Sequence, residues 1–156
     1  SWQKKNQGLI PEDVLNAAMA LGVNVLAVDP QHSEVVYAAT TKGLFRSTDQ
    51  AEHWTDIGQG LSHQFVSTLA LHPTDSNTLY VGGPDGIRKT VDGGKTWQPQ
   101  NEGLTTLNIR TISISPSDPQ VLYLGTNGSG LYRSTDGGQH WASIPLVSPN
   151  QAPPKV

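Results

Sequence analysis

The chain has 156 residues, no cysteine and a formal net charge of −3 at pH 7, with 15% of its residues charged. The missing cysteines exclude a disulfide scaffold, a thiolate zinc site and a cysteine nucleophile. The lack of a basic cluster argues against nucleic acid as a partner. The longest uncharged apolar stretch, residues 14–28, is too short to span a membrane, and the sequence shows no signal peptide.

A unit of about 43 residues occurs three times along the chain. The same residue types recur at this spacing: Leu26, Leu69 and Ile112; Pro30, Pro73 and Pro116; Tyr37, Tyr80 and Tyr123. Within each unit, four short segments show period-two alternation or enrichment in Val, Leu and Tyr, and turn signals separate them. The unit therefore predicts an all-β fold of four-stranded antiparallel β-propeller blades and excludes a helical repeat.

Aligning the units gives the expected order of elements. Residues 1–9, SWQKKNQGL, align with HWTDIGQGL and TWQPQNEGL, so they are expected to form an orphan fourth strand of a preceding blade. Residues 10–23 are an inserted connection, in which Pro11, Glu12 and Asp13 precede a run that is either a short helix or a longer loop. Blades follow at 24–61, 62–104 and 105–146, and the proline-rich residues 147–156 are expected to be a tail or linker.

Three blades cannot close a ring without exposed sheet edges. The chain is therefore expected to be either a segment of a longer propeller or a protomer that associates with copies of itself. In the second case, the orphan strand would pair with another protomer.

One turn motif recurs before each fourth strand, as STDQAEHW, TVDGGKTW and STDGGQHW. An aspartate in a tight turn can accept hydrogen bonds from N–H groups a residue or two ahead, and glycines supply the positive φ angles that such turns need. The first copy has Gln50 and Ala51 in place of the glycines, so we expect that turn to be less well formed, or to be a type I turn without positive φ. We assign the motif a structural role, carried by Ser47, Asp49, Trp54, Thr90, Asp92, Gly94, Trp97, Ser134, Asp136, Gly138 and Trp141.

These strings resemble the Asp-box, or BNR, repeat of sialidases, xyloglucan-cleaving glycoside hydrolases, sortilin-type Vps10 receptors and photosystem II assembly and stability factors. The surrounding pattern is closest to the last three groups and covers residues 24–146. The resemblance implies a β-propeller with the boxes at the outer edges of its blades, and an extracytoplasmic location that is periplasmic, lumenal or secreted. It implies no particular activity, because these families share the repeat and do unrelated things.

Residues that break the repeat are the candidates for a binding face: Pro11, Glu12, Asp13, Asp85, Arg110 and Asn127. Arg110 stands at the start of an innermost strand, where it could meet an anionic group or remain a solvated surface charge. Arg46, Arg88 and Arg133 are assigned to one repeat position, with their stems covering apolar surface.

We assign no catalytic residue, metal ligand or cofactor, because the carboxylates form no recognisable glycosidase pair and the histidines show no ligand spacing. The sequence thus favours a non-catalytic protein-interaction or assembly module. Its partner would be another protein, or a second copy bound through unpaired blade edges. The alternative is a portion of a glycoside hydrolase or a sialidase-like propeller.

Overall fold

The computed structural model describes residues 1–3, 5, 7–9, 21–61 and 65–146. Residues 10–20 of the expected connection at 10–23, with Pro11, Glu12 and Asp13, lie outside the described residues, as does the tail at 147–156. The described part of the chain contains twelve strands and no helix. It accordingly holds no helix long and apolar enough to cross a membrane.

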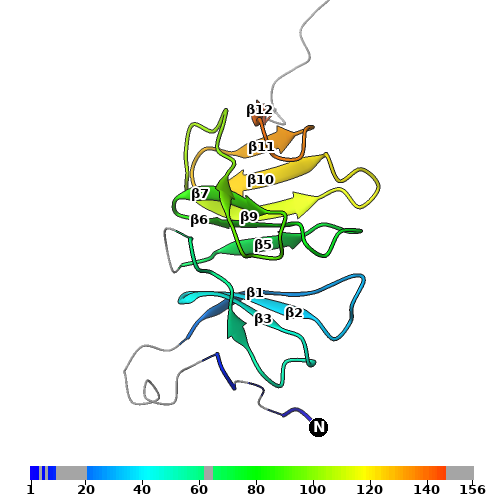
Figure 1. Cartoon of the computed structure of the whole chain (residues 1–156). Coiled ribbons are helices and arrows are strands. Elements are labelled where there is room, and N and C mark those ends of the chain that lie inside the picture. The colour runs from blue at the N-terminus through cyan, green and yellow to red at the C-terminus, as the bar shows by residue number, and fades with distance from the viewer. Residues whose placement is uncertain (4, 6, 10–20, 62–64, 147–156) are drawn as a thin grey trace, which may run out of the picture.

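The strands form three four-stranded antiparallel sheets, which stand in a row in Figure 1. Blade 1 contains β1 (Val23–Val28), β2 (Val36–Thr40), β3 (Gly43–Ser47) and β4 (Thr55–Asp56). Blade 2 contains β5 (Thr68–Leu71), β6 (Leu79–Gly83), β7 (Gly86–Thr90) and β8 (Gln98–Pro99). Blade 3 contains β9 (Ile109–Ile114), β10 (Leu122–Thr126), β11 (Leu131–Ser134) and β12 (Ala142–Ile144). Neighbouring strands are consecutive in every sheet, which confirms the predicted propeller blades.

Two hydrophobic cores lie between the blades. The first joins Tyr37, Ala39 and Leu44 of blade 1 to Leu79 and Val81 of blade 2. The second joins Tyr80 and Ile87 of blade 2 to residues of blade 3 that include Ile112, Leu122 and Trp141. Successive side chains along a strand point to opposite faces of the sheet, so each blade packs on a given neighbour through one face.

The strand register corrects one repeat assignment. Tyr37 pairs with Arg46, Tyr80 with Lys89, and Tyr123 with Arg133. Lys89 is therefore the blade 2 counterpart of Arg46 and Arg133, and the prediction that placed Arg88 there is wrong. Arg88 lies one residue earlier, at the position that Phe45 and Tyr132 occupy in the other blades.

The described residues among the first nine form one isolated parallel bridge, between Gln7 and His53, and no strand ladder. Leu9 is buried against Ala38, Phe45 and Trp54 in a third hydrophobic cluster, on the side of blade 1 that faces away from blade 2. An antiparallel neighbour for the expected orphan strand would be the third strand of a preceding blade, which these 156 residues do not include. The pairing of that strand therefore stays a prediction.

Candidate functional site

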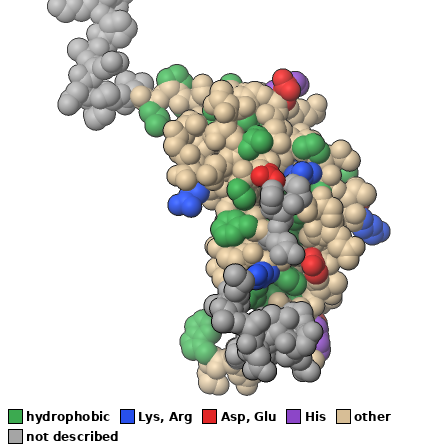
Figure 2. All heavy atoms as spheres, turned by 90° about the vertical axis from the view of Figure 1, so that its left-hand side faces the viewer, with side chains coloured by type: hydrophobic (Ala, Val, Ile, Leu, Met, Phe, Trp, Pro, Cys, Tyr) green, Lys and Arg blue, Asp and Glu red, His purple; other side chains and the backbone are tan. Residues whose placement is uncertain are grey.

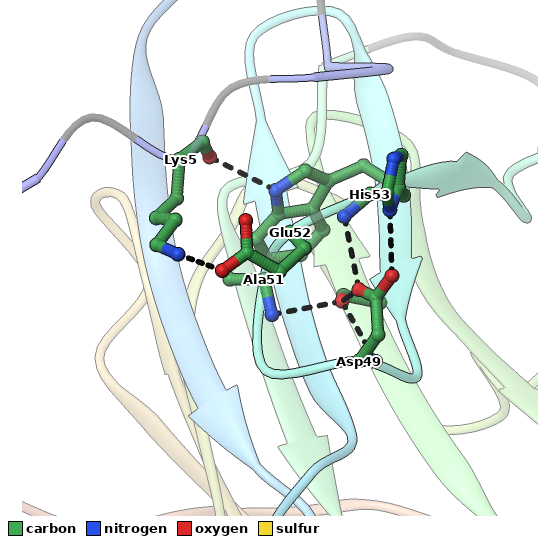
Figure 3. A network of polar contacts seen from close by, with 7 residues as sticks. Lys5, Asp49, Ala51, Glu52 and His53 are labelled. Atoms are coloured by element: carbon green, nitrogen blue, oxygen red, sulfur yellow. Dashed lines mark hydrogen bonds and ion pairs between the residues drawn. The ribbon is translucent and has the colours of Figure 1, made fainter.

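The three turn motifs, residues 47–54, 90–97 and 134–141, have the same hydrogen bonds, and we call them the box turns. In the first, Ser47 Oγ donates to Asp49 Oδ1 at 2.8 Å and accepts the N–H of Ala51 at 2.9 Å (Figure 3). Thr90 and Ser134 repeat both bonds in the other two turns, with distances of 2.7–2.9 Å. The hydroxyl at the end of the third strand thus bonds both the box aspartate and the main-chain N–H on the far side of the turn.

Each box aspartate accepts a main-chain hydrogen bond from the residue four positions ahead, at 2.9 Å in all three turns. The expected reach of one or two residues is therefore wrong, because the turn is wider than a two-residue Asx turn. The second carboxylate oxygen bonds His53 Nδ1 at 2.7 Å, Thr96 Oγ1 at 2.6 Å and His140 Nδ1 at 2.7 Å, respectively.

These hydrogen bonds favour the charged carboxylates. The main-chain and side-chain bonds from His53, followed by that from Ser47, lower the pKa of Asp49 to about 2. The pKa of Asp92 is lowered to about 2 chiefly by Thr96, whose side chain contributes most and whose main-chain N–H comes next. The pKa of Asp136 is lowered to about 2 by His140, first through its N–H and then through its ring.

The first box turn forms fully, although glycine is missing from it. Gln50 has φ +58° and Ala51 has φ +68°, close to the +69° of Gly137 and the +88° of Gly138 in the third turn. The expectation of a poorer turn, or of a type I turn without positive φ, is therefore wrong. The Ser47 and Asp49 bonds hold two non-glycine residues in the left-handed region, where they are disfavoured.

Trp97 and Trp141 fill the space between neighbouring blades, and Trp54 packs in the third hydrophobic cluster on the outer side of blade 1. Trp54, Trp97 and Trp141 are buried, and each indole N–H donates to a carbonyl of the preceding segment: Lys5 O at 3.1 Å, Ile57 O at 3.2 Å and Gln100 O at 2.9 Å. In all three blades the box turn also bonds the loop between the first and second strands, for example through Gly137 N and Gln120 O at 2.9 Å. The box turns therefore stabilise the blades and their packing.

We call the side of the molecule opposite the box turns the loop face. It carries the turns between the second and third strands of each blade and the connections between blades. It is the side seen in Figure 2, where hydrophobic side chains and charges of both signs are interspersed. Val66 N donates to Thr40 O, Ser67 N to Gly82 O, and Asn127 N to Asn108 O, so each connection is bonded to a neighbouring turn or strand end.

Two adjoining hollows on this side share Leu61, and together we call them the loop-face groove. The larger has a volume of about 200 Å³ and is polar, with Lys42, Asp56 and Gln59 among its lining residues. The smaller, of about 30 Å³, is mainly apolar and lies between blades 1 and 2. Its lining comprises Leu61, Phe65, Val66, Val81, Gly82, Gly83, Pro84, Asp85, Gly86 and Arg88.

Departures from the repeat explain why the groove lies here. A Cβ on Gly8 would lie 2.3 Å from Trp54 O, and one on Gly103 would lie 2.1 Å from Trp141 O. At the equivalent Gly60, a Cβ would meet no described atom within 4 Å. The connection after blade 1 therefore stands away from the box tryptophan of the next blade. In addition, Arg88 replaces the aromatic ring found at this position in the other blades.

The candidate binding residues do not all come together. Asp85 lines the groove, in the turn between β6 and β7. Arg110 is exposed on β9 and Asn127 is exposed in the turn after β10, and both belong to blade 3. The sequence analysis missed Lys42, Leu61, Phe65 and Arg88 as groove residues. Phe65 could have been found, because Asn108 stands at the same repeat position in the next blade.

The part of the chain that the structure describes contains no group of three or more His, Asp or Glu side chains that could hold a metal ion. No protein-family model and no curated protein sequence matches the chain.

Solved structures share its fold. A GH74 enzyme from Niastella koreensis is 28% identical, with a TM-score of 0.66, over 80% of this chain and 22% of that chain. The GH74 xyloglucanase from Xanthomonas campestris is 18% identical, with a TM-score of 0.62, over 84% of this chain and 24% of that one.

YCF48 bound to a D1 peptide is 18% identical, with a TM-score of 0.62, and covers 80% of this chain and 40% of that chain. YCF48 from Cyanidioschyzon merolae is also 18% identical, with a TM-score of 0.64, covering 90% of this chain and 47% of that one. The chain thus spans from about a fifth to about half of the length of these proteins, and it has the β-propeller fold that they share.

Proposed function

We propose that the chain is a non-catalytic β-propeller module that binds a segment of another protein in the loop-face groove. The observation that carries this proposal is the groove itself, in which an apolar hollow adjoins a polar one at Leu61. Binding sites for extended segments commonly combine an apolar anchor pocket with polar groups that fix the main chain. YCF48, which has the same fold, is found bound to a D1 peptide.

Each half of the groove has a distinct part in this proposal. Phe65 is 44% exposed beside Pro84, so an incoming apolar side chain can cover ring surface that is now in water. The small hollow beside it has room for about one methyl group or water molecule. Lys42, Asp56 and Gln59 line the larger hollow, where they can form hydrogen bonds with the main chain of the same segment.

The carboxylates support binding over glycoside hydrolysis. Seven aspartates accept short hydrogen bonds within turns: Asp29, Asp49, Asp56, Asp75, Asp92, Asp118 and Asp136. Four of these, Asp49, Asp75, Asp92 and Asp136, have their pKa lowered. A glycosidase acid needs a raised pKa and a second carboxylate across the sugar, so these four are poorly suited to that role.

A binding experiment tests the proposal with two probes, the D1 peptide and a phage-displayed library of short random peptides. We expect peptides selected on the wild-type chain to lose at least roughly tenfold in affinity for the Phe65→Asp variant, because a carboxylate replaces the apolar anchor. Val91→Asp is the matched control, since Val91 is 63% exposed within the second box turn and does not line the groove. Equal binding to wild type and Phe65→Asp would overturn the assignment of the groove.

The alternative function has its own assay. Incubation of the chain with xyloglucan, the polymer named for one of the structural neighbours, should release no reducing ends above a buffer control. Release that disappears in an Asp56→Asn or Asp85→Asn variant would contradict the non-catalytic proposal, because these two carboxylates line the groove.

A further inference from the structure

Asn127 and Gly128 are the one place in the sequence where a glycine follows an asparagine. Both are exposed in the turn between β10 and β11, and a Cβ on Gly128 would meet no described atom within 4 Å. Among the described residues, neither the Asn127 side chain nor the Gly128 N–H forms a hydrogen bond. A side-chain amide and the main-chain nitrogen that follows it are therefore both unbonded and open to water.

This exposure belongs to the tip of the turn. The equivalent tips in blades 1 and 2 are also exposed, at Lys42 and Pro84, although each of those blades has the next blade packed against it. The turn of blade 3 is one residue longer, with the string NGSG in place of TKG and PDG. A tip of this kind is open to water whether or not a neighbouring blade follows.

The box turns also place a glycine after an acidic side chain, but both groups are bonded there. In the second box turn, Gly93 N donates to Asn77 O at 3.0 Å, and Asp92 Oδ1 accepts the N–H of Thr96 at 2.9 Å. The third box turn repeats both hydrogen bonds. The side chain and the following nitrogen are thus held apart from each other's chemistry in the box turns and left free at Asn127.

We propose that Asn127 is a site of spontaneous deamidation, through a succinimide ring formed with Gly128. The Gly128 nitrogen gives its proton to hydroxide, and its electron pair forms a bond to Asn127 Cγ. The Cγ–Nδ2 bond then breaks, and Nδ2 takes a proton from water and leaves as ammonia. Water opens the ring at either carbonyl carbon: opening at Cγ leaves an aspartate, and opening at the main-chain carbon leaves an isoaspartate. The step is intramolecular and needs no co-reactant other than water.

Both products change the loop face of blade 3. Each adds one negative charge to a chain whose formal net charge is −3, because a carboxyl group is ionised at neutral pH. The isoaspartate also adds a carbon to the main chain between two hydrogen bonds that flank the pair. These are Asn127 N to Asn108 O at 2.9 Å and Ser129 N to Thr126 Oγ1 at 3.1 Å.

Anion-exchange chromatography of the full chain, after incubation in buffers from mildly acidic to mildly alkaline pH, tests the proposal. We expect a product with one more negative charge, which elutes with freshly prepared Asn127→Asp and forms faster as the pH rises. Peptide mass spectrometry should locate the change at residue 127 and detect both aspartate and isoaspartate there. A wild-type chain that stays unmodified in alkaline buffer, or that reacts first at another asparagine, overturns the proposal.

Two variants separate the structure of the turn from the dipeptide alone. Asn127→Gln should slow the reaction at residue 127 at least roughly tenfold, because its longer side chain must form a larger ring. Asp92→Asn is the matched control, since it places a second asparagine before a glycine, in a turn where Gly93 N is bonded. In the folded variant, residue 92 should react at least roughly tenfold more slowly than residue 127.

In urea, where both turns are unfolded, residues 92 and 127 of this variant should react at similar rates. Equal rates in the folded variant would contradict the proposal, because the hydrogen bonds would then offer no protection. A difference in rate that persists in urea would also contradict it, because the fold would not be its cause.

Discussion

Two tyrosines at the same repeat position differ in one hydrogen bond. The Tyr80 hydroxyl donates to Gly137 O at 2.8 Å. The Tyr37 hydroxyl is buried and has no hydrogen-bond partner among the described residues. Burial raises the pKa of Tyr37 above its ordinary value, against the opposing effect of Arg46, which lies 5.8 Å from the ring centre. Comparing the two tyrosines therefore separates the effect on stability of burying a hydroxyl group from the effect of its hydrogen bond.

We predict that Tyr80→Phe destabilises the chain by about 0.5–1.5 kcal/mol, because it removes a buried hydrogen bond and leaves Gly137 O with only the longer bond from Lys89 Nζ, at 3.3 Å. Tyr37→Phe should change the free energy of unfolding by less than about 0.5 kcal/mol, or stabilise the chain, because the hydroxyl it removes is unbonded. Urea unfolding of both variants measures the difference. Equal destabilisation by the two substitutions would show that the Tyr37 hydroxyl has a partner, such as a bound water molecule.

The first box turn offers a stabilising substitution. Gln50 is exposed at φ +58°, so Gln50→Gly should relieve backbone strain of about 1 kcal/mol, partly offset by the greater freedom of glycine in the unfolded chain. We expect a small rise in Tm. The reverse change in the third turn, Gly137→Gln, should lower Tm, because φ is +69° there and the new Cβ would lie 3.0 Å from Gln120 Oε1. A fall in Tm for Gln50→Gly would contradict this account.

For single residues, comparing the units by residue type gives the right repeat position only where the same residue type recurs at the same point of the strand register. The repeating tyrosines lie at one register position, opposite Arg46, Lys89 and Arg133, because the pattern around them is intact in every unit. Arg88 was misassigned because it was aligned by residue type, although the strand Gly86–Thr90 places Lys89 opposite Tyr80. Gln50 and Ala51 misled the turn prediction, because side-chain hydrogen bonds from Ser47 and Asp49 outweigh their backbone preference.

The box turns contain the aspartates whose pKa is lowered most among the described residues. Asp49, Asp92 and Asp136 have a pKa of about 2 in the folded chain, against about 3.9 for an unperturbed aspartate. A carboxyl group whose pKa is lower in the folded state stabilises the fold when it is charged. Its contribution is complete above about pH 4 and is lost as the pH falls to about 2.

We therefore predict that the free energy of unfolding falls steeply between about pH 4 and about pH 2. Asp92→Asn should lower stability at neutral pH and should also make this acid-induced fall shallower, because one of the three box carboxyl groups with a pKa of about 2 is gone. Asp92 is the best choice for the variant, since its partner is Thr96, which does not titrate in this range. Urea unfolding from pH 6 to pH 2.5 measures both effects, and identical slopes for variant and wild type would contradict the prediction.

The strands and box turns could be predicted from the sequence because each depends on local chemistry that recurs in every unit. The groove could not, because it depends on how far a connection stands from the next tryptophan. Gly8, Gly60 and Gly103 are the same residue in the same motif, and only the packing around them shows that Gly60 is open. The orphan strand and the helix-or-loop at residues 10–20 stay predictions.

For the whole molecule, the repeat gives blade 2 one face that packs on blade 1 and one that packs on blade 3, and departures from the repeat form the loop-face groove. The loop-face groove lies between blades 1 and 2, with Phe65 and Asp85 among its residues.

The most direct test of the central claim is a map of the binding site by NMR chemical shifts, recorded with and without the D1 peptide or a peptide selected from the library. The account predicts that the largest shifts fall on Lys42, Leu61, Phe65, Asp85 and Arg88, which line the loop-face groove. The box turns at residues 47–54, 90–97 and 134–141 should change little. Largest shifts in the box turns, or shifts spread evenly over the three blades, would contradict the assignment of the groove as the binding site.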